Sequence, residues 1–219
     1  MQITWLGHAG IQIIANHKAL YLDPVIDTYF LSNYRKADLI LISTADTDHF
    51  SMECVRNLMS DAGFICGTAE AASLMNSISS LRTNEVRNFE FCKVKAMPTK
   101  PGGRNRQNSI LGFLINIEDK TIYYPGDTQY LQEMNGLKPD VLLLPVGGTF
   151  SPTAREAYEW LRFIEPKIVI PIHYGRLDGT IDDANELLSL APIHLQKRIR
   201  ILKEKEMMDV DLILREISI

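Results

Sequence analysis

The chain has 219 residues, of which 46% are hydrophobic and 23% are charged. This is the composition of an ordinary globular protein and excludes a mostly disordered chain. The 23 Lys and Arg residues face 27 Asp and Glu residues, so the net charge is −4. A mildly acidic chain lacks the basic surplus of a dedicated nucleic-acid-binding protein. The length predicts a single domain over residues 1–219.

The three cysteines, Cys54, Cys66 and Cys92, are widely spaced. An odd number without paired spacing predicts neither a disulfide framework nor a zinc ribbon, and favours buried free thiols. The first residues do not resemble a signal peptide, and no apolar run reaches the roughly 18 residues of a membrane-spanning helix. We therefore expect a soluble, cytoplasmic protein without a membrane partner. The sequence leaves its oligomeric state open.

The predicted elements begin with short strands that form an antiparallel meander, because turn residues separate short, partly alternating apolar runs. An almost unbroken apolar run then predicts a strand covered on both faces. The last third alternates strands and helices, which favours an α/β class with mixed sheets. The predicted strands are residues 2–6, 11–15, 19–22, 38–43, 64–66, 91–97, 110–117, 121–124, 141–144, 167–171 and 198–202, and the predicted helices are residues 51–60, 69–77, 152–164 and 182–190.

Three of these strands end in polar loops that carry Asp or His. Asp48 and His49 follow the unbroken apolar strand, Asp127 follows the second strand of a hairpin, and His173 follows a late strand. Loops that follow buried strands commonly collect functional side chains. Taken singly, such an Asp is more often a helix cap and such a His a structural residue. Together, two carboxylates and two imidazoles suit a divalent metal.

Several stretches, in this order, resemble the metallo-β-lactamase fold family and its lactonase-like branch of metal-dependent hydrolases. They are ITWLGHAGIQI with YLDP, then KTIYYPGDT, then DVLLLPVGGTFSPTAREAYEWLRFIEPKIVIPIHYG. The resemblance covers nearly the whole chain. It implies a four-layer αββα sandwich, with two mixed sheets back to back, helices outside, and a metal site along one edge of the sheets.

The central motif departs from this family. The family signature is His-x-His-x-Asp-His, but Thr44 and Asp46 stand here in place of the first two histidines. The chain also has no histidine between His49 and His173, where the family supplies a further ligand. The resemblance therefore implies that the first of two metal sites is lost, except for the shared Asp127.

The second metal site of the family is retained as Asp48, His49, Asp127 and His173. We expect these four residues to hold one divalent metal, zinc or manganese. The alternative is that the site has lost useful metal affinity. Of the other histidines, His17 and His194 are expected on the solvated surface, outside the site.

The lost first site predicts a compensating charge, because a pocket that keeps carboxylates without a cation is costly when partly buried. The loop at residues 98–108 is basic. One hypothesis is that Lys100 or Arg104 from this loop pairs with Asp46. The other is that these cations form a solvated loop.

Three further features complete the candidate site. His8 matches a histidine of the branch near the site mouth, and is expected to hydrogen-bond a metal ligand or a substrate oxygen. Asp23, before a proline, is expected to tie its strand to a loop. The loop Gly147-Gly148-Thr149 offers backbone amides that suit an anionic group, although a simple turn is an equally good interpretation.

Hypotheses of function from different classes remain open. In the first, the chain is a mononuclear metal-dependent hydrolase of a lactone, ester, amide or phosphodiester, with Asp46 or Asp127 accepting a proton and His8 assisting. Its partner would be a small molecule, and the basic loop favours an anionic one. In the second, the chain is a catalytically silent relative that binds a ligand or serves as a structural subunit. RNA processing is a weaker third hypothesis, opposed by the acidic balance.

Overall fold

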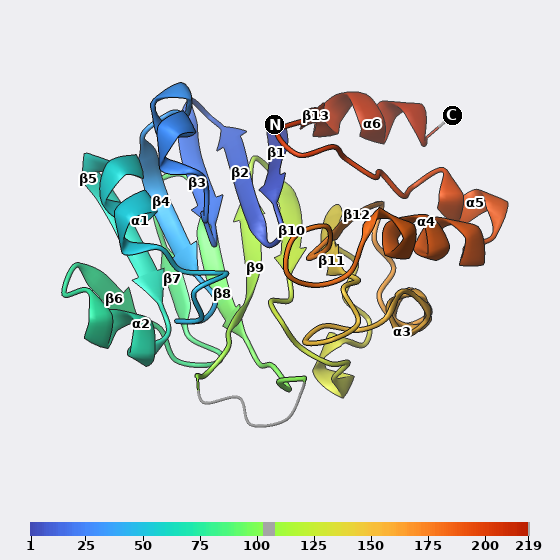
Figure 1. Cartoon of the computed structure of the whole chain (residues 1–219). Helices are drawn as coiled ribbons and strands as arrows, with labels where there is room; N and C mark the ends of the chain where they lie inside the picture. Colours follow the sequence, from blue (N-terminus) through green and yellow to red (C-terminus); the bar gives the residue numbers. More distant parts are fainter. Residues whose placement is uncertain (103–107, 219) are drawn as a thin grey trace.

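The computed structural model describes residues 1–102 and 108–218, and its strands form two sheets (Figure 1). The described strands of the first sheet, in spatial order, are β13 (Met207–Asp209), β1 (Gln2–Gly7), β2 (Gly10–Ala15), β3 (Lys18–Leu22), β4 (Ala37–Ile42), β5 (Met59–Gly67) and β6 (Ile78–Ser80). Those of the second are β12 (Ile168–Ile172), β11 (Val141–Pro145), β10 (Lys120–Tyr124), β9 (Gly112–Ile117), β8 (Lys93–Met97) and β7 (Val86–Asn88).

Helices cover the outer faces of the two sheets. Figure 1 shows α1 and α2 on the side of the first sheet, and α3 and α4 on the opposite side. This arrangement confirms the αββα sandwich expected from the sequence. The helices are η1 (Thr28–Asn33), α1 (Met52–Leu58), α2 (Ala69–Leu74), η2 (Gln132–Met134), α3 (Ala154–Trp160), α4 (Ile181–Leu190), α5 (Ile193–Gln196) and α6 (Val210–Glu216).

The unbroken apolar run of β4 is explained by burial on both faces of its sheet. Leu39 and Leu41 belong to the main core cluster, which includes strands of both sheets. Ile40 and Ile42 point the other way and belong to a second cluster with Val55 of α1. Because successive side chains of a strand alternate between faces, a strand between two apolar layers needs apolar residues at every position.

The two sheets share a similar plan of strand directions. The antiparallel meander β1–β2–β3 is confirmed, and β3 then pairs with β4 in parallel. In the second sheet, β9 and β10 form the expected antiparallel hairpin, and β10, β11 and β12 are parallel. The carboxyl ends of parallel strands meet at one edge of a sheet, so the loops after β3, β4, β10, β11 and β12 gather at two adjoining edges.

Several expectations about secondary structure are wrong in detail. The predicted helices 69–77 and 152–164 are shorter, at Ala69–Leu74 and Ala154–Trp160. The segment 198–202 is no strand, because only Ile199 bridges to Val169 at the edge of β12. Its apolar residues cover the core instead, where Ile199 and Leu202 are buried. The predicted helix 51–60 ends at Leu58, since the chain enters β5 at the next residue.

Other expectations about burial hold. Cys54, Cys66 and Cys92 are buried free thiols. His17 and His194 are exposed. Among the described residues, the helices are too short or too polar to cross a membrane.

Candidate metal centre

His49 lies at the centre of a buried cluster of imidazoles and carboxylates. It ends the loop after β4, where its backbone N–H donates to the carbonyl of Asp46 over 2.9 Å. Its Nδ1 lies 2.7 Å from Oδ2 of Asp23. Its Nε2 lies 3.1 Å from Oδ2 of Asp127 and 3.3 Å from Nε2 of His173. One ring nitrogen of His49 is thus held by Asp23, and the other faces the candidate ligands.

His173 and Asp127 come from the second sheet and meet the first sheet here. Asp127 follows β10, and His173 follows β12. Nε2 of His173 lies 2.8 Å from Oδ1 of Asp127. On the other side of the ring, Nδ1 lies 3.3 Å from Oδ2 of Asp178, in a contact that is not aligned as a hydrogen bond. Asp178 is a residue that the sequence reasoning missed.

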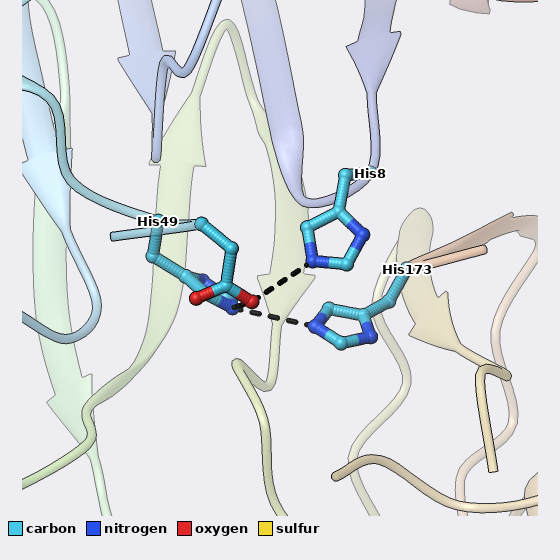
Figure 2. A group of neighbouring side chains, drawn as sticks. His8, His49 and His173 are labelled. Atoms are coloured by element: carbon cyan, nitrogen blue, oxygen red, sulfur yellow. Dashed lines mark hydrogen bonds and ion pairs between the residues drawn. The ribbon is translucent and has the colours of Figure 1, made fainter. Parts of the chain in front are cut away.

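His8 brings a third imidazole to the same point. It lies in the turn between β1 and β2, and its Nε2 is 3.1 Å from Oδ2 of Asp48. Figure 2 shows the rings of His8, His49 and His173 turned toward one another. The His8 and His173 ring centroids are 4.0 Å apart. One ligand atom from each of His8, Asp48, His49 and His173 lies within 4.8 Å of all the others.

The backbone at three of these positions is unusual. His8, Asp23 and His173 have φ values of 51°, 42° and 62°. Residues other than glycine rarely adopt this left-handed conformation, and such strain concentrates at functional sites. The backbone N–H of His173 donates to the carbonyl of His8 over 2.8 Å, which ties two of the strained positions together.

The charges of the cluster are strongly coupled. Burial alone would raise the pKa of Asp127, but His49 and His173 beside it hold that pKa well below its usual value. Burial alone would lower the pKa of His49 and of His173, but the Asp127 carboxylate raises both, with help from Asp23 at His49. Without a metal, the protein therefore stabilises ionised carboxylates against protonated imidazoles.

His8 behaves differently from the other two histidines. Burial lowers the pKa of His8, and the nearby Asp48 offsets this only in part. The pKa of Asp48 is itself lowered, because contact with His8 and His49 outweighs the opposing effect of burial. At neutral pH, His8 is thus a neutral imidazole, the form that can bind a metal or donate one hydrogen bond.

Asp23 ties β3 to the loop after β4, as the sequence suggested. Its Oδ1 accepts from the backbone N–H of Ser43 over 2.6 Å, and its Oδ2 accepts from the Ser43 hydroxyl. The Tyr124 hydroxyl, which belongs to the second sheet, donates to the same Oδ2 over 2.6 Å. Asp23 therefore fixes the orientation of His49 from behind.

Thr44 and Asp46, which replace the signature histidines, belong to a small network of hydrogen-bonded polar side chains. Asp46 accepts from Thr44 Oγ1 over 3.2 Å and from Asn108 Nδ2 over 2.6 Å. Asn108 was not singled out in the sequence, because an asparagine at the end of a polar loop carries no distinctive signal. Of the cations proposed to pair with Asp46, Arg104 lies outside the described residues. Lys100 lines a groove beside Tyr130.

The donor atoms of the cluster fit a divalent cation. Metal–ligand distances of about 2.0–2.2 Å place neighbouring donors about 2.8–3.1 Å apart in octahedral geometry and about 3.3–3.6 Å apart in tetrahedral geometry. The separations between donor atoms of Asp127, His49 and His173 run from 2.8 to 3.3 Å, and Asp48 Oδ2 lies 3.6 Å from His49 Nε2. Mixed imidazole and carboxylate donors suit zinc, iron or manganese better than magnesium or calcium.

The layered fold and the edge cluster together define the class of metal-dependent hydrolases with a metallo-β-lactamase fold. The chain belongs to the beta-lactamase superfamily, because the model of that domain family matches residues 2–173. The resemblance noted in the sequence is thereby confirmed, and the relatives described next bear the name of the expected class, metal-dependent hydrolase.

The known relatives carry the same class name. The chain is 29% identical to a UPF0173 metal-dependent hydrolase of Pelotomaculum thermopropionicum, over 96% of this chain and 100% of that protein. It is 30% identical to a UPF0173 metal-dependent hydrolase of Listeria welshimeri, over 80% and 86% of the two chains. Among solved structures, the metallo hydrolase Igni18 of Ignicoccus hospitalis superimposes with a TM-score of 0.81 at 20% identity, over 94% and 97% of the chains.

Proposed function

We propose that this protein is a hydrolase that works with one divalent cation, held by Asp48, His49, Asp127 and His173. The observation that carries this proposal is the convergence of the His49 and His173 Nε2 atoms on the Asp127 carboxylate, at 3.1 and 2.8 Å. Each of these donors is buried, and each ring is contacted at its other nitrogen by a carboxylate. Such support of the ligands from behind is typical of metal sites.

A divalent cation bound here would lower the pKa of a water molecule and polarise a carbonyl or phosphoryl oxygen. Asp46 is the proposed proton acceptor. Asp127 suits that role less, because its pKa is held well below the usual value by His49 and His173. Thr44 and Asn108 donate to Asp46 and fix the direction of its carboxylate.

His8 has two proposed roles that one variant distinguishes. Its contact with Asp48 supports a positioning role, in which Nε2–H holds the carboxylate toward the cation. Its place in the four-donor cluster supports direct binding of the cation. In His8→Gln, a side-chain amide can still donate to Asp48, so metal affinity survives if His8 only positions that carboxylate. A loss as large as in His173→Ala identifies His8 as a ligand.

The proposed substrate is a small molecule with a lactone, ester, amide or phosphodiester bond. Lys100, on the described part of the basic loop, is exposed and supports a preference for an anionic substrate. The competing proposal is a catalytically silent ligand-binding relative. It is supported by the hydrogen bonds among Thr44, Asp46 and Asn108, which satisfy side chains where the family has its first metal site.

The test combines metal content with turnover. The protein, purified without added metal, is assayed on lactones, phosphodiesters and acyl amides after addition of zinc or manganese. Metal-dependent turnover that disappears in His173→Ala supports the hydrolase. A protein that holds metal but turns over none of these substrates favours the silent relative.

A further inference from the structure

We infer that Asp178 positions His173 for metal binding, and that the loop after β11 is built to hold the Asp178 carboxylate. Asp178 would act through His173 and would not itself touch metal or substrate. The inference rests on the proposed function, because it concerns the geometry of one proposed ligand.

The loop at residues 147–151 surrounds the Asp178 carboxylate with donors. The backbone N–H of Thr149 donates to Oδ1 over 3.2 Å, and that of Phe150 donates to Oδ2 over 3.4 Å. The Ser151 hydroxyl lies 3.4 Å from Oδ2 and also accepts from the Gly147 N–H over 2.9 Å. For the loop Gly147-Gly148-Thr149, the sequence left open a site for an anion or a simple turn, and of its three amides that of Thr149 contacts an anion. Here the anion is a carboxylate of the chain itself.

Two glycines, Gly147 and Gly179, allow the Asp178 carboxylate to lie close to the 147–151 loop. A Cβ on Gly147 would lie 2.2 Å from Oδ2 of Asp178. A Cβ on Gly179 would lie 2.8 Å from the Cα of Gly147, and Gly179 has a φ of 57°. Any side chain at position 147 would push the carboxylate out of the loop, since real Cβ atoms do not approach other atoms so closely. The two segments are thus shaped to bring Asp178 into the loop.

The same carboxylate reaches the far side of the His173 ring. Asp178 Oδ2 lies 3.3 Å from Nδ1 of His173, and both side chains are almost fully buried. Nε2, on the opposite side of the ring, faces Asp127. A proton kept on Nδ1 by Asp178 leaves the Nε2 lone pair available to a cation. Asp23 stands in the corresponding relation to His49, at 2.7 Å.

The two histidines are therefore supported in different ways. Asp23 is anchored within the sheets, by Ser43 and Tyr124. Asp178 is anchored by a surface loop, and its contact with His173 is longer and less well aligned than that of Asp23 with His49. Such contacts often tighten when the site is complete. A residue that served only to close the loop would need no buried contact with the imidazole.

The test compares Asp178→Asn with the wild-type protein for zinc affinity, by competition with a chromophoric chelator. Asparagine carries no charge and replaces one carboxylate oxygen with an NH2 group, so that NH2 group faces either the Thr149 N–H or Nδ1 of His173, where an acceptor stood before. We expect zinc to bind about 10–100-fold more weakly, the usual cost of losing such a partner. Thermal unfolding of the metal-free variant checks that it folds.

The matched control is Asp140→Asn. Asp140 also ties a backbone N–H, that of Thr121, and lies at the start of β11, at the opposite end of that strand from the 147–151 loop. This variant should lose stability and keep its zinc affinity within about twofold, because a merely structural effect does not reach the metal. Unchanged zinc affinity in folded Asp178→Asn overturns the inference.

A second measurement needs no variant at Asp178. Nitrogen NMR of the zinc-loaded wild-type protein should show His173 protonated at Nδ1 and zinc-bound through Nε2. Zinc on Nδ1 of His173 contradicts both the inference and the Nε2 geometry of the proposed site, whereas unchanged zinc affinity in folded Asp178→Asn overturns the inference alone. A wild-type protein that binds no zinc or manganese overturns the proposed function, and this inference with it.

Discussion

Asp23 and His49 form a fully buried pair, with Oδ2 of Asp23 2.7 Å from Nδ1 of His49. The pair also connects the two sheets, because Tyr124 of β10 donates to the same carboxylate from the second sheet. The group that orients a proposed metal ligand is therefore also part of the core. Both metal affinity and the stability of the fold should therefore depend on Asp23.

The first prediction concerns this shared residue. Asp23→Ala leaves His49, Ser43 and Tyr124 without their common buried partner, and should lower the free energy of unfolding by about 3–5 kcal/mol. Tyr124→Phe removes a single hydrogen bond to the same carboxylate and should cost about 1.5–3 kcal/mol. Urea unfolding of the metal-free proteins gives both values. An Asp23→Ala variant as stable as Tyr124→Phe would show that the carboxylate is not the centre of this network.

A second prediction separates ligands from the proton acceptor. His173→Ala and Asp48→Ala each remove a proposed ligand, so metal content and turnover should fall together. Asp46→Ala should keep its metal and lose rate by about 10²–10⁴-fold, the usual contribution of a general base. Metal analysis and initial rates on the same samples provide the comparison. Full activity in Asp46→Ala would assign the proton transfer to another group.

The third prediction concerns the pH dependence of metal binding. Burial alone would lower the pKa of His49 and of His173, but Asp127 raises both above the usual 6.5, so in the metal-free protein both rings hold their protons to a higher pH than a free imidazole does. A cation must displace these protons. Zinc affinity should therefore continue to rise with pH beyond about 6.5, where it would level off for a free imidazole, by about tenfold per pH unit for each proton released. Chelator competition between pH 6 and 8 measures this slope, and a flat profile would contradict it.

A fourth prediction concerns acid stability. Burial alone would raise the pKa of Asp178, but contacts with His173, with Thr149 and with the Phe150 amide lower it from 3.8 to about 2. A lowered folded-state pKa contributes stability above the unfolded value, and that contribution is lost as pH falls toward the folded value. The stability advantage of wild-type over Asp178→Asn, both metal-free, should be constant between about pH 5 and 6.5, below the range in which His173 loses its proton, and should shrink between about pH 4 and 2. Urea unfolding across this range tests it.

The fifth prediction concerns the lost first site. Thr44→His with Asp46→His restores two of the signature histidines, and should raise metal uptake only in part because a third imidazole is missing. Asn108 already reaches Asp46 over 2.6 Å, so Asn108→His is the natural third substitution. We expect the triple variant to take up more metal per chain than the double variant. Equal uptake by the two would place the missing ligand elsewhere.

Much of the fold follows from patterns that lie within one segment of the chain. The unbroken apolar residues of β4 predicted burial on both faces, and the loops after β4, β10 and β12 predicted where the site would form. The strand β13 was missed, since its three residues are strand only through pairing with β1 at the other end of the chain. Residues 198–202 failed as a strand for the opposite reason: their apolar residues are buried, but only one of them bridges to a neighbour.

The site residues, too, could be predicted where the signal lies within one segment, and were missed where it depends on a contact between distant segments. Asp48, His49, Asp127 and His173 were singled out because each lies in a loop that follows a strand, and because the family resemblance matched them to its second metal site. Their carboxylate partners are harder to find. Asp178 is held by a loop about 30 residues earlier in the chain, and nothing in its own neighbourhood distinguishes it from Asp182 or Asp183. The available signal was the Gly147-Gly148 pair, which fitted a bound anion and a simple turn equally well and did not point to Asp178.

The most direct test of the account is the number of metal ions per chain. The protein is purified without added metal, incubated with excess zinc or manganese, freed of loose ions and analysed for metal. With Asp48, His49, Asp127 and His173 as the ligand set and Thr44 and Asp46 in place of two histidines, we predict about one equivalent per chain, lost in His173→Ala. Two tightly held equivalents, or none, would contradict the account.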